Sequence, residues 1–147
     1  GWFGTTGMTV RVERGFDINA SPDEVWEFIA DPAQRARAIS VVDRFEQRGE
    51  TMIWHIALPI PFVRTTIRVK TRDEVREEPN YVKFSGRSRA FNVTGEHEIR
   101  EEDDHSHVSN VFVVDGRAPG VERFFKRNFG SEIQNLERAL RRYLDDQ

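Results

Sequence analysis

The stretch VERFFKRNFGSEIQNLERALRRYL, residues 121–144, determines which architecture the rest of the chain must supply. Its apolar side chains recur every three or four residues, the spacing of one face of an α-helix. The members of this apolar stripe are Val121, Phe124, Phe125, Phe129, Ile133, Leu136, Ala139, Leu140, Tyr143 and Leu144. Charged residues, including Glu132, fill the positions between them and are assigned to a solvated face. Pro119-Gly120 breaks the chain just before the stretch. We therefore predict one long amphipathic helix that must lie on another apolar surface.

The composition indicates a globular chain with a charged exterior. Its 147 residues are 37% apolar and 32% charged, and the net charge is -3. This balance gives no overall nucleic-acid signature. The 11 Phe and three Trp supply bulky groups for a core or a pocket. Because the chain has no cysteine, disulfides, a thiol nucleophile and a cysteine metal site are excluded.

The first seven residues, Gly1–Gly7, look unlike the rest of the chain and precede Met8. We interpret them as a cloning remnant or an upstream extension, and we expect one domain over residues 8–147. No apolar run reaches the roughly 18 residues of a transmembrane helix. No basic segment followed by an apolar core marks a secretory signal. We therefore expect a cytoplasmic protein, a monomer or a homodimer, without a transmembrane segment.

Upstream of the helix, apolar and polar residues alternate, as they do in strands with one buried face. We predict strands at residues 9–18, 41–48, 51–58, 62–77, 81–86, 90–102 and 105–114. In the longest of them, Ile67, Val69 and Val75 are expected to share the inner face. Ser21-Pro22-Asp23-Glu24 is a capping box that starts a short helix, and Asp31-Pro32 starts a second one. The order β-α-α-β6-α predicts an α+β fold with an antiparallel sheet of about seven strands.

This order of elements, with the stretch FDINASPDEVWEFIADP at residues 16–32, resembles the SRPBCC superfamily, the START-like or Bet v 1-like helix-grip proteins. The resemblance covers residues 9–144 and is greatest to the polyketide cyclase/dehydrase-like or CoxG-like branch. It implies a curved sheet wrapped around the C-terminal helix. It also implies a cavity between them that receives an apolar or amphipathic small molecule. The fold hosts carriers, receptors, cyclases and co-chaperones, so it specifies function poorly.

The inward faces of the strands and the long helix supply the residues that we expect to bind this ligand. They are Trp54, Ile56, Ile67, Val69, Phe84, Phe91, His97, Asn110, Phe112, Phe125, Phe129 and Ile133. His97 and Asn110 are the polar members, and a buried polar group without a partner costs about 1–3 kcal/mol. Each needs a partner: the other residue, a strand backbone, a water or the ligand. They either orient the ligand's polar end or are satisfied core residues.

Binding or transport of a lipid, quinone or polyketide-like molecule is therefore our first hypothesis, with no cofactor. The alternative is a cyclase or dehydrase acting on a polyketide-like substrate, which requires a pocket acid or base. The candidates for that role are His97 and Asp73, which ends the inner face of the longest strand. No nucleophile elbow and no glycine-rich phosphate loop is present.

Three further features of the sequence carry weaker expectations. His105-x-His107 beside the acidic run 101–104 supplies too few ligands for a zinc site, so we interpret it as a charged hairpin and expect no metal. Gly95, within a strand, is expected to mark a bulge or a bend. The Phe124-Phe125 end of the helix, tethered through Pro119-Gly120, is the expected gate of the cavity.

Two groups of cations suggest a third hypothesis, an adaptor with a basic face. They are Arg64, Arg68, Lys70 and Arg72 on the outer side of the longest strand, and Arg123, Lys126 and Arg127 on the helix. These residues are either a solvated surface or a docking surface for an anionic partner such as a lipid headgroup, a protein or RNA.

Overall fold

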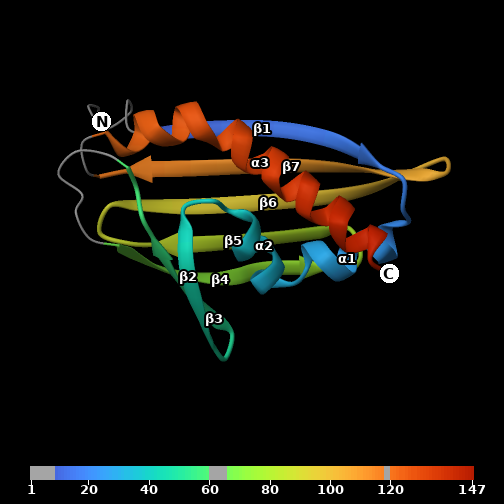
Figure 1. The fold of residues 1–147 in the computed structure, drawn as a ribbon, viewed down its shortest axis with the longest axis horizontal. Helices are drawn as coiled ribbons and strands as arrows, with labels where there is room; N and C mark the ends of the chain where they lie inside the picture. The colour runs from blue at the N-terminus through green and yellow to red at the C-terminus, as the bar shows by residue number, and fades with distance from the viewer. Residues whose placement is uncertain (1–8, 60–65, 118–119) are drawn as a thin grey trace.

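The computed structural model describes residues 9–59, 66–117 and 120–147, which form a seven-stranded antiparallel sheet and three helices (Figure 1). In chain order the elements are β1 (Thr9–Ile18), α1 (Pro22–Ile29), α2 (Pro32–Ala38), β2 (Val42–Arg48), β3 (Thr51–Ile56), β4 (Ile67–Glu77), β5 (Tyr81–Arg87), β6 (Phe91–Glu102), β7 (His105–Gly116) and α3 (Val121–Asp145). The strands lie in the order β1-β7-β6-β5-β4-β3-β2. The predicted α+β helix-grip fold is confirmed.

The two short helices begin where the sequence signals predict. The Ser21 hydroxyl accepts from the backbone N–H of Glu24 at 3.3 Å, and the Glu24 carboxylate accepts from the Ser21 N–H at 2.9 Å. This reciprocal pair satisfies two backbone donors that a helix start leaves free. At the second start, Asp31 accepts from the Ala33 N–H at 2.9 Å. The two caps fix where α1 and α2 begin on the sheet.

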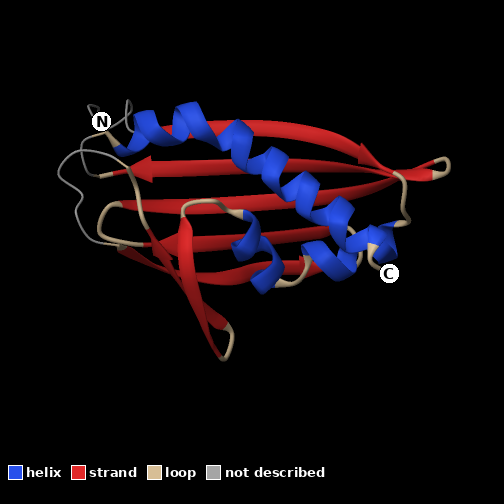
Figure 2. Cartoon of the chain, in the orientation of Figure 1, coloured by secondary structure: helices blue, strands red, loops and turns tan. Residues whose placement is uncertain are grey.

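All three helices cover the same face of the curved sheet (Figure 2). The long helix α3 packs on β1 and β7 and crosses the face obliquely until its C-terminal part meets α1 (Figure 1). Its stripe divides between two apolar clusters. Phe125, Phe129 and Ile133 belong to the first cluster, whereas Leu136 and Leu140 pack with α1 in the second. The candidate site lies where these clusters meet.

A β-bulge in β4 overturns the predicted inner face at its C-terminal end. The pairing with β5 steps from Asp73↔Phe84 to Val75↔Lys83, so one extra residue is inserted on β4. A one-residue slip moves each later side chain to the other face. Val75, predicted to face inward, is therefore 38% exposed. Arg76 instead turns toward the helices, where its guanidinium donates to the Ala30 carbonyl at 2.7 Å.

Gly95 does not mark a bulge, because the pairings of β6 with β5 and β7 pass through it without a register shift. Its role is steric. A Cβ at this position would lie 2.1 Å from the ring of Phe84, the residue directly opposite on β5. The missing side chain thus lets the Phe84 ring lie flat against β6.

Several strand boundaries differ from the sequence prediction by one or two residues, and the break between β3 and β4 shows the physical reason most clearly. The strand β3 ends at Ile56 instead of Leu58. Within the described residues β4 begins at Ile67, and Thr66 lies outside it. The predicted start at Phe62 falls outside the described residues. Pro59 follows the end of β3, and it has no backbone N–H to donate to a regular ladder.

Candidate functional site

Nine of the twelve predicted ligand-binding residues belong to one apolar cluster on the helix-covered face of the sheet, Ile67 packs against it, and His97 and Asn110 are buried polar residues. Ile67 is partly buried, and the other members of the set are buried. Aromatic rings fill much of this cluster. Phe125 lies 5.0 Å from Phe91 and 4.8 Å from Phe129, and Phe129 stacks on Phe112 at 5.1 Å, measured between ring centroids. At these separations the rings are in contact. These four rings are thus packed against one another, and of the four only Phe112 and Phe129 also border the cavity.

A small cavity remains between α2, α3 and the centre of the sheet. Its volume is about 20 Å³. The lining residues are Arg35, Ile39, Phe84, His97, Phe112, Phe129, Glu132 and Leu136. About 10–15 Å³ measured in this way holds one water, whereas ligand pockets span roughly 300–1,000 Å³. The space therefore admits one water-sized group in this conformation.

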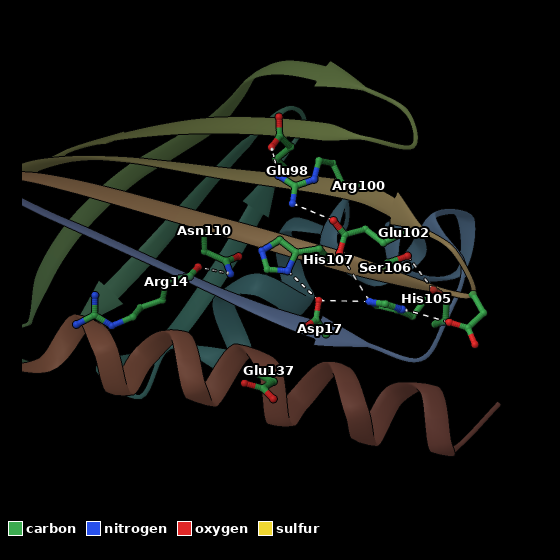
Figure 3. Close-up of polar contacts among 12 residues, drawn as sticks. Arg14, Asp17, Glu98, Arg100, Glu102, His105, Ser106, His107, Asn110 and Glu137 are labelled. Carbon is green, nitrogen blue, oxygen red and sulfur yellow. Dashed lines mark hydrogen bonds and ion pairs between the residues drawn. The ribbon is translucent and has the colours of Figure 1, made fainter.

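His97 and Asn110 are partners, one of the arrangements that the sequence left open. They stand opposite each other on β6 and β7, and His97 Nδ1 lies 2.8 Å from Asn110 Oδ1. The Asn110 amide nitrogen donates to the Arg14 carbonyl at 3.2 Å (Figure 3). The Asn110 side-chain oxygen is therefore the atom that faces the His97 imidazole. An amide oxygen only accepts, so His97 Nδ1 must carry the proton.

The other ring nitrogen, His97 Nε2, is consequently an acceptor. It is buried and has no hydrogen-bond partner among the described residues. Burial, and secondly the charge of Arg35, lower the pKa of His97 to about 4, against smaller opposing effects of the Asn110 hydrogen bond and the Asp73 charge. The imidazole is therefore neutral at pH 7. The cavity thus presents one buried lone pair on an otherwise largely apolar wall.

A buried ion-pair network lies beside the cavity. The Arg35 guanidinium pairs with the Asp73 carboxylate and donates to the Ile29 carbonyl at 2.8 Å. The other Asp73 oxygen lies 2.6 Å from Arg76. Burial lowers the pKa of Arg35, and Asp73 offsets part of that effect. Asp73, one of the two catalytic candidates, is thus occupied by two arginines and does not line the cavity.

Glu132 was predicted to be solvated, and this prediction is wrong. It lies 7% exposed on the inner side of α3. Its carboxylate accepts from the Ser40 backbone N–H at 2.9 Å and from the Ser40 hydroxyl at 2.7 Å. These bonds join α3 to the segment between α2 and β2. A buried carboxylate is tolerated here because both of its oxygens are hydrogen-bonded.

Sequence reasoning did not include three of the lining residues in the site: Arg35, Ile39 and Glu132. The helical spacing of the sequence does predict which side of each helix these residues lie on. Phe125, Phe129, Glu132 and Leu136 follow one another at intervals of four, three and four, which places Glu132 on the apolar stripe. Arg35 precedes Ile39 by four residues and shares its side of α2. Glu132 was missed because its charge predicts exposure, and Arg35 was not assigned to either side of its helix.

A scan against protein-family models matches residues 9–141 to the family described as polyketide cyclase / dehydrase and lipid transport. The chain belongs to this family. The match extends from the first residue of β1 into the last turns of α3. It therefore includes every residue of the candidate site. No curated protein sequence matches the chain significantly.

Solved structures of the START-like superfamily share the fold of this family member. A conserved protein from Geobacillus kaustophilus is similar with a TM-score of 0.74 and 14% identity, over 93% of this chain and 96% of that one. The Zhui aromatase/cyclase from Streptomyces sp. R1128 has a TM-score of 0.67 and 17% identity, over 92% and 96%. A START superfamily protein from Mycobacterium smegmatis has a TM-score of 0.69 and 11% identity, over 92% and 97%. At these identities the likeness shows the fold alone.

The two predicted groups of cations do not form one face. Arg123, Lys126 and Arg127 of α3 line a groove against β1. Arg68, Lys70 and Arg72 are exposed on β4, and β4 and β1 are separated by β5, β6 and β7 in the sheet. Arg64 falls outside the described residues. The basic surface thus consists of two separate patches.

The predicted gate is described only in part, because Pro119 falls outside the described residues. Gly120 adopts a φ of 86°, a left-handed conformation that suits glycine, immediately before α3. Phe125 is 5% exposed. The gate at this end stays a prediction. Within the described residues, no helix is long and apolar enough to cross a membrane.

Proposed function

We propose that this family member binds a small hydrophobic molecule that carries a hydrogen-bond donor, held between the sheet and α3. The observation that carries the proposal is the unpartnered lone pair on His97 Nε2, buried in a cavity walled by Phe84, Phe112 and Phe129. A buried acceptor without a donor is costly, and interiors rarely retain one unless a water or a ligand completes it.

The acceptor narrows the class of ligand. A hydroxyl or an amine can donate to His97 Nε2, whereas a quinone carbonyl only accepts. The proposal therefore favours a phenol, an enol, a sterol-like alcohol or a protonated acid over a quinone. Because the pKa of His97 is lowered to about 4, the nitrogen remains an acceptor at neutral pH. The aromatic walls suit a ring system attached to the donor.

Binding requires the closed cavity to enlarge. About 20 Å³ holds no ring system, so one wall must move away from the sheet. The wall between α2 and α3 is joined across the cavity by polar contacts of Glu132 with Ser40. When the wall opens, water can replace the hydrogen bonds between Glu132 and Ser40. Apolar contacts have no such replacement in water. We place the opening at this contact, with α3 and the α2–β2 segment separating as the ligand enters.

The same observations support binding in preference to catalysis. A general base works best when its pKa lies near the operating pH, and the pKa of His97 is lowered to about 4. Asp73 pairs with Arg35 and Arg76 and does not line the cavity. Neither of the two predicted catalytic candidates is thus placed to act as an efficient base.

Matched ligands test the proposal. We expect 2-naphthol to bind the protein about 3–10-fold more tightly than naphthalene, because the hydroxyl satisfies His97 and one net hydrogen bond is worth about 0.5–1.5 kcal/mol. The readouts are calorimetric titration and thermal shift. The variant His97→Leu should bind the two compounds equally. Equal binding of both compounds by the wild-type protein, or no binding of either, contradicts the proposal even if the variant fails to fold.

An adaptor role is a second candidate, carried by the pair Lys70 and Arg87. They stand directly opposite each other across β4 and β5, and both are exposed. Like charges facing each other across strands are destabilising. They line a groove of about 350 Å³ together with Arg72, Ser85 and Glu74. The Glu74 carboxylate contacts both Arg72 and Ser85 and leaves Lys70 and Arg87 facing each other. An anionic lipid headgroup would relieve the repulsion.

Vesicle sedimentation tests this adaptor role. The protein should sediment with vesicles containing phosphatidylglycerol and should remain free with pure phosphatidylcholine. Replacing both Lys70 and Arg87 with Glu should abolish the binding. The matched control is Arg138→Glu on the exposed side of α3. If the double variant sediments with the phosphatidylglycerol vesicles as much as the wild-type protein does, this surface is excluded as the lipid-binding site.

A further inference from the structure

We propose that the outer face of the sheet, where β1, β6 and β7 meet beside the β6–β7 turn, holds a divalent transition-metal ion such as Zn²⁺. The ligands are Asp17, Glu102 and His105, and solvent completes the coordination (Figure 3). The inference is independent of the interior cavity, which lies on the other face of the sheet.

Strand register brings the three ligands together. Glu102 and His105 stand directly opposite each other on β6 and β7. Asp17, on β1, pairs with His107 two residues further along β7. One donor atom from each of the three ligands lies within 4.8 Å of the others. The site therefore needs no rearrangement of the backbone.

The separations between donors suit a metal better than a hydrogen bond. His105 Nε2 lies 3.5 Å from Asp17 Oδ1 and 3.7 Å from Glu102 Oε1, beyond the usual range of N–H···O contacts. Bonds of about 2.0–2.1 Å in tetrahedral geometry place neighbouring ligands roughly 3.4 Å apart. The nitrogen thus lies between two carboxylates at spacings close to the edges of a coordination polyhedron.

Neighbouring groups orient the ligands from outside. His105 Nδ1 contacts the Asp104 carboxylate at 3.3 Å, which leaves Nε2 directed at the other two ligands. His107 Nδ1 lies 2.9 Å from Asp17 Oδ1, the same oxygen that faces His105, so this oxygen would accept from His107 with one lone pair and bind the metal with the other. Arg100 holds the second oxygen of Glu102 at 3.2 Å. Outer partners of this kind fix the ring orientation and the basicity of metal-bound histidines and carboxylates.

The fold brings a further ligand, Asp17, next to His105, whereas the sequence pattern alone offered too few ligands. The motif His105-x-His107 suggested two imidazole ligands, but the His107 ring lies over Gly15, where a Cβ would come within 2.7 Å of its Nε2. His107 therefore acts as an orienting residue, and Asp17 from the distant first strand provides the missing ligand. The donor set of one imidazole and two carboxylates suits Zn²⁺, Mn²⁺ or Co²⁺.

Zn²⁺ titration of the full chain after treatment with a chelator tests the site. Calorimetry should detect one site, and His105→Gln and Asp17→Asn should each weaken the affinity at least 10-fold. Asp104→Asn, which removes only an orienting contact, should weaken it about 10–100-fold. The control Glu98→Gln, on the same face of β6, should bind as the wild-type protein does.

Two spectroscopic readouts separate coordination from adventitious binding. On addition of Zn²⁺ the ¹⁵N resonance of His105 Nε2 should shift, while those of the buried His97 should not. Co²⁺ should give visible absorption bands that Asp17→Asn removes. Absence of Zn²⁺ binding by the wild-type protein overturns the proposal. Unchanged affinity in both His105→Gln and Asp17→Asn, each folded by circular dichroism, overturns it equally.

Discussion

The His97 imidazole and the Asn110 side-chain oxygen lie 2.8 Å apart, directly across the pairing of β6 and β7. Asn110 therefore determines which nitrogen of His97 carries the proton, and it leaves the lone pair on Nε2. Because the Asn110 amide nitrogen is anchored on the Arg14 carbonyl at 3.2 Å, the oxygen cannot turn away without losing that bond. The strand register thus sets the hydrogen-bonding character of the cavity.

Asn110→Ala should destabilise the protein by about 1–3 kcal/mol, because it leaves the buried Nδ1–H of His97 without an acceptor. Urea unfolding monitored by tryptophan fluorescence measures the change. The matched control is Asn92→Ala, since the side-chain oxygen of Asn92 has no hydrogen-bond partner among the described residues. An equal loss in both variants would show that the His97–Asn110 bond is not the cause.

Stability should depend on the protonation of His97. Its pKa is lowered to about 4 in the folded protein, chiefly by burial and secondly by Arg35. An unfolded histidine titrates near about 6.5. Between these values the unfolded chain binds a proton that the folded chain lacks. The free energy of unfolding therefore falls as the pH falls from 6.5 to about 4. Above this window His97 is neutral in both the folded and the unfolded chain, so it adds no pH dependence there.

The variant His97→Gln should flatten this pH dependence. A shift of this size corresponds to about 3 kcal/mol across the window, since one pKa unit is worth about 1.4 kcal/mol. Urea unfolding at several pH values gives the difference between the two proteins. Both should retain the further loss at lower pH that follows from Asp17 and Glu46, whose pKa values are lowered by hydrogen bonds. Parallel profiles from pH 7 to 5 would contradict the prediction.

Much of the fold could be predicted because its signals are local. The capping box at Ser21, the alternation along each strand and the stripe of α3 each depend on neighbours within a few residues. The β4 bulge escaped prediction because alternation assumes an unbroken period of two. The extra residue moved Val75 outward and Arg76 inward, and the sequence has no glycine at that point to mark it.

The candidate site was less predictable because its polar members depend on distant partners. The burial of Glu132 rests on Ser40, which lies 92 positions away along the chain, and that of Arg35 rests on Asp73, 38 positions away. Helical spacing places Glu132 and Arg35 near the apolar sides of their helices. Charge alone, however, predicts an exposed side chain, so their burial is not evident from the sequence. The size of the cavity also depends on how rings such as Phe112 and Phe129 pack, which no periodic pattern encodes.

Asp73→Asn should cost about 3–5 kcal/mol of stability, because it leaves the buried Arg35 guanidinium without its counter-charge. Thermal and urea unfolding measure the loss. The control Glu74→Gln, in an exposed pair with Arg72, should change stability by less than about 1 kcal/mol. A catalytic Asp73 would give a different result: a folded protein of nearly wild-type stability that has lost a reaction.

Glu132→Gln should weaken the contact between α3 and the α2–β2 segment. Hydrogen bonds to a charged group are worth about 1.5–3 kcal/mol, and the neutral amide retains part of this. Amide hydrogen exchange at Ser40 should accelerate, and binding of 2-naphthol should become faster if this contact opens the cavity. Glu137→Gln, which removes an exposed pair with Arg141, is the control and should leave both rates unchanged. Unchanged exchange at Ser40 would contradict the role of this contact.

Phe129→Ala distinguishes a packed wall from an open one. The Phe129 ring is 5% exposed and contacts both Phe112 and Phe125, so its removal should cost about 3–5 kcal/mol. A loss below about 1 kcal/mol would instead mean that the ring borders open space. Phe124→Ala is the matched control, because that ring is only partly buried at the edge of the cluster and should cost less.

The same variant should convert the cavity of about 20 Å³ into one that holds a ring. An apolar cavity of about 150 Å³ stays dry and binds benzene. Benzene should therefore raise the melting temperature of Phe129→Ala without affecting the wild-type protein. With His97 still in place, phenol should stabilise the variant more than benzene does, since its hydroxyl can donate to Nε2. Equal stabilisation by benzene and phenol would show that His97 does not contribute to recognition of the ligand.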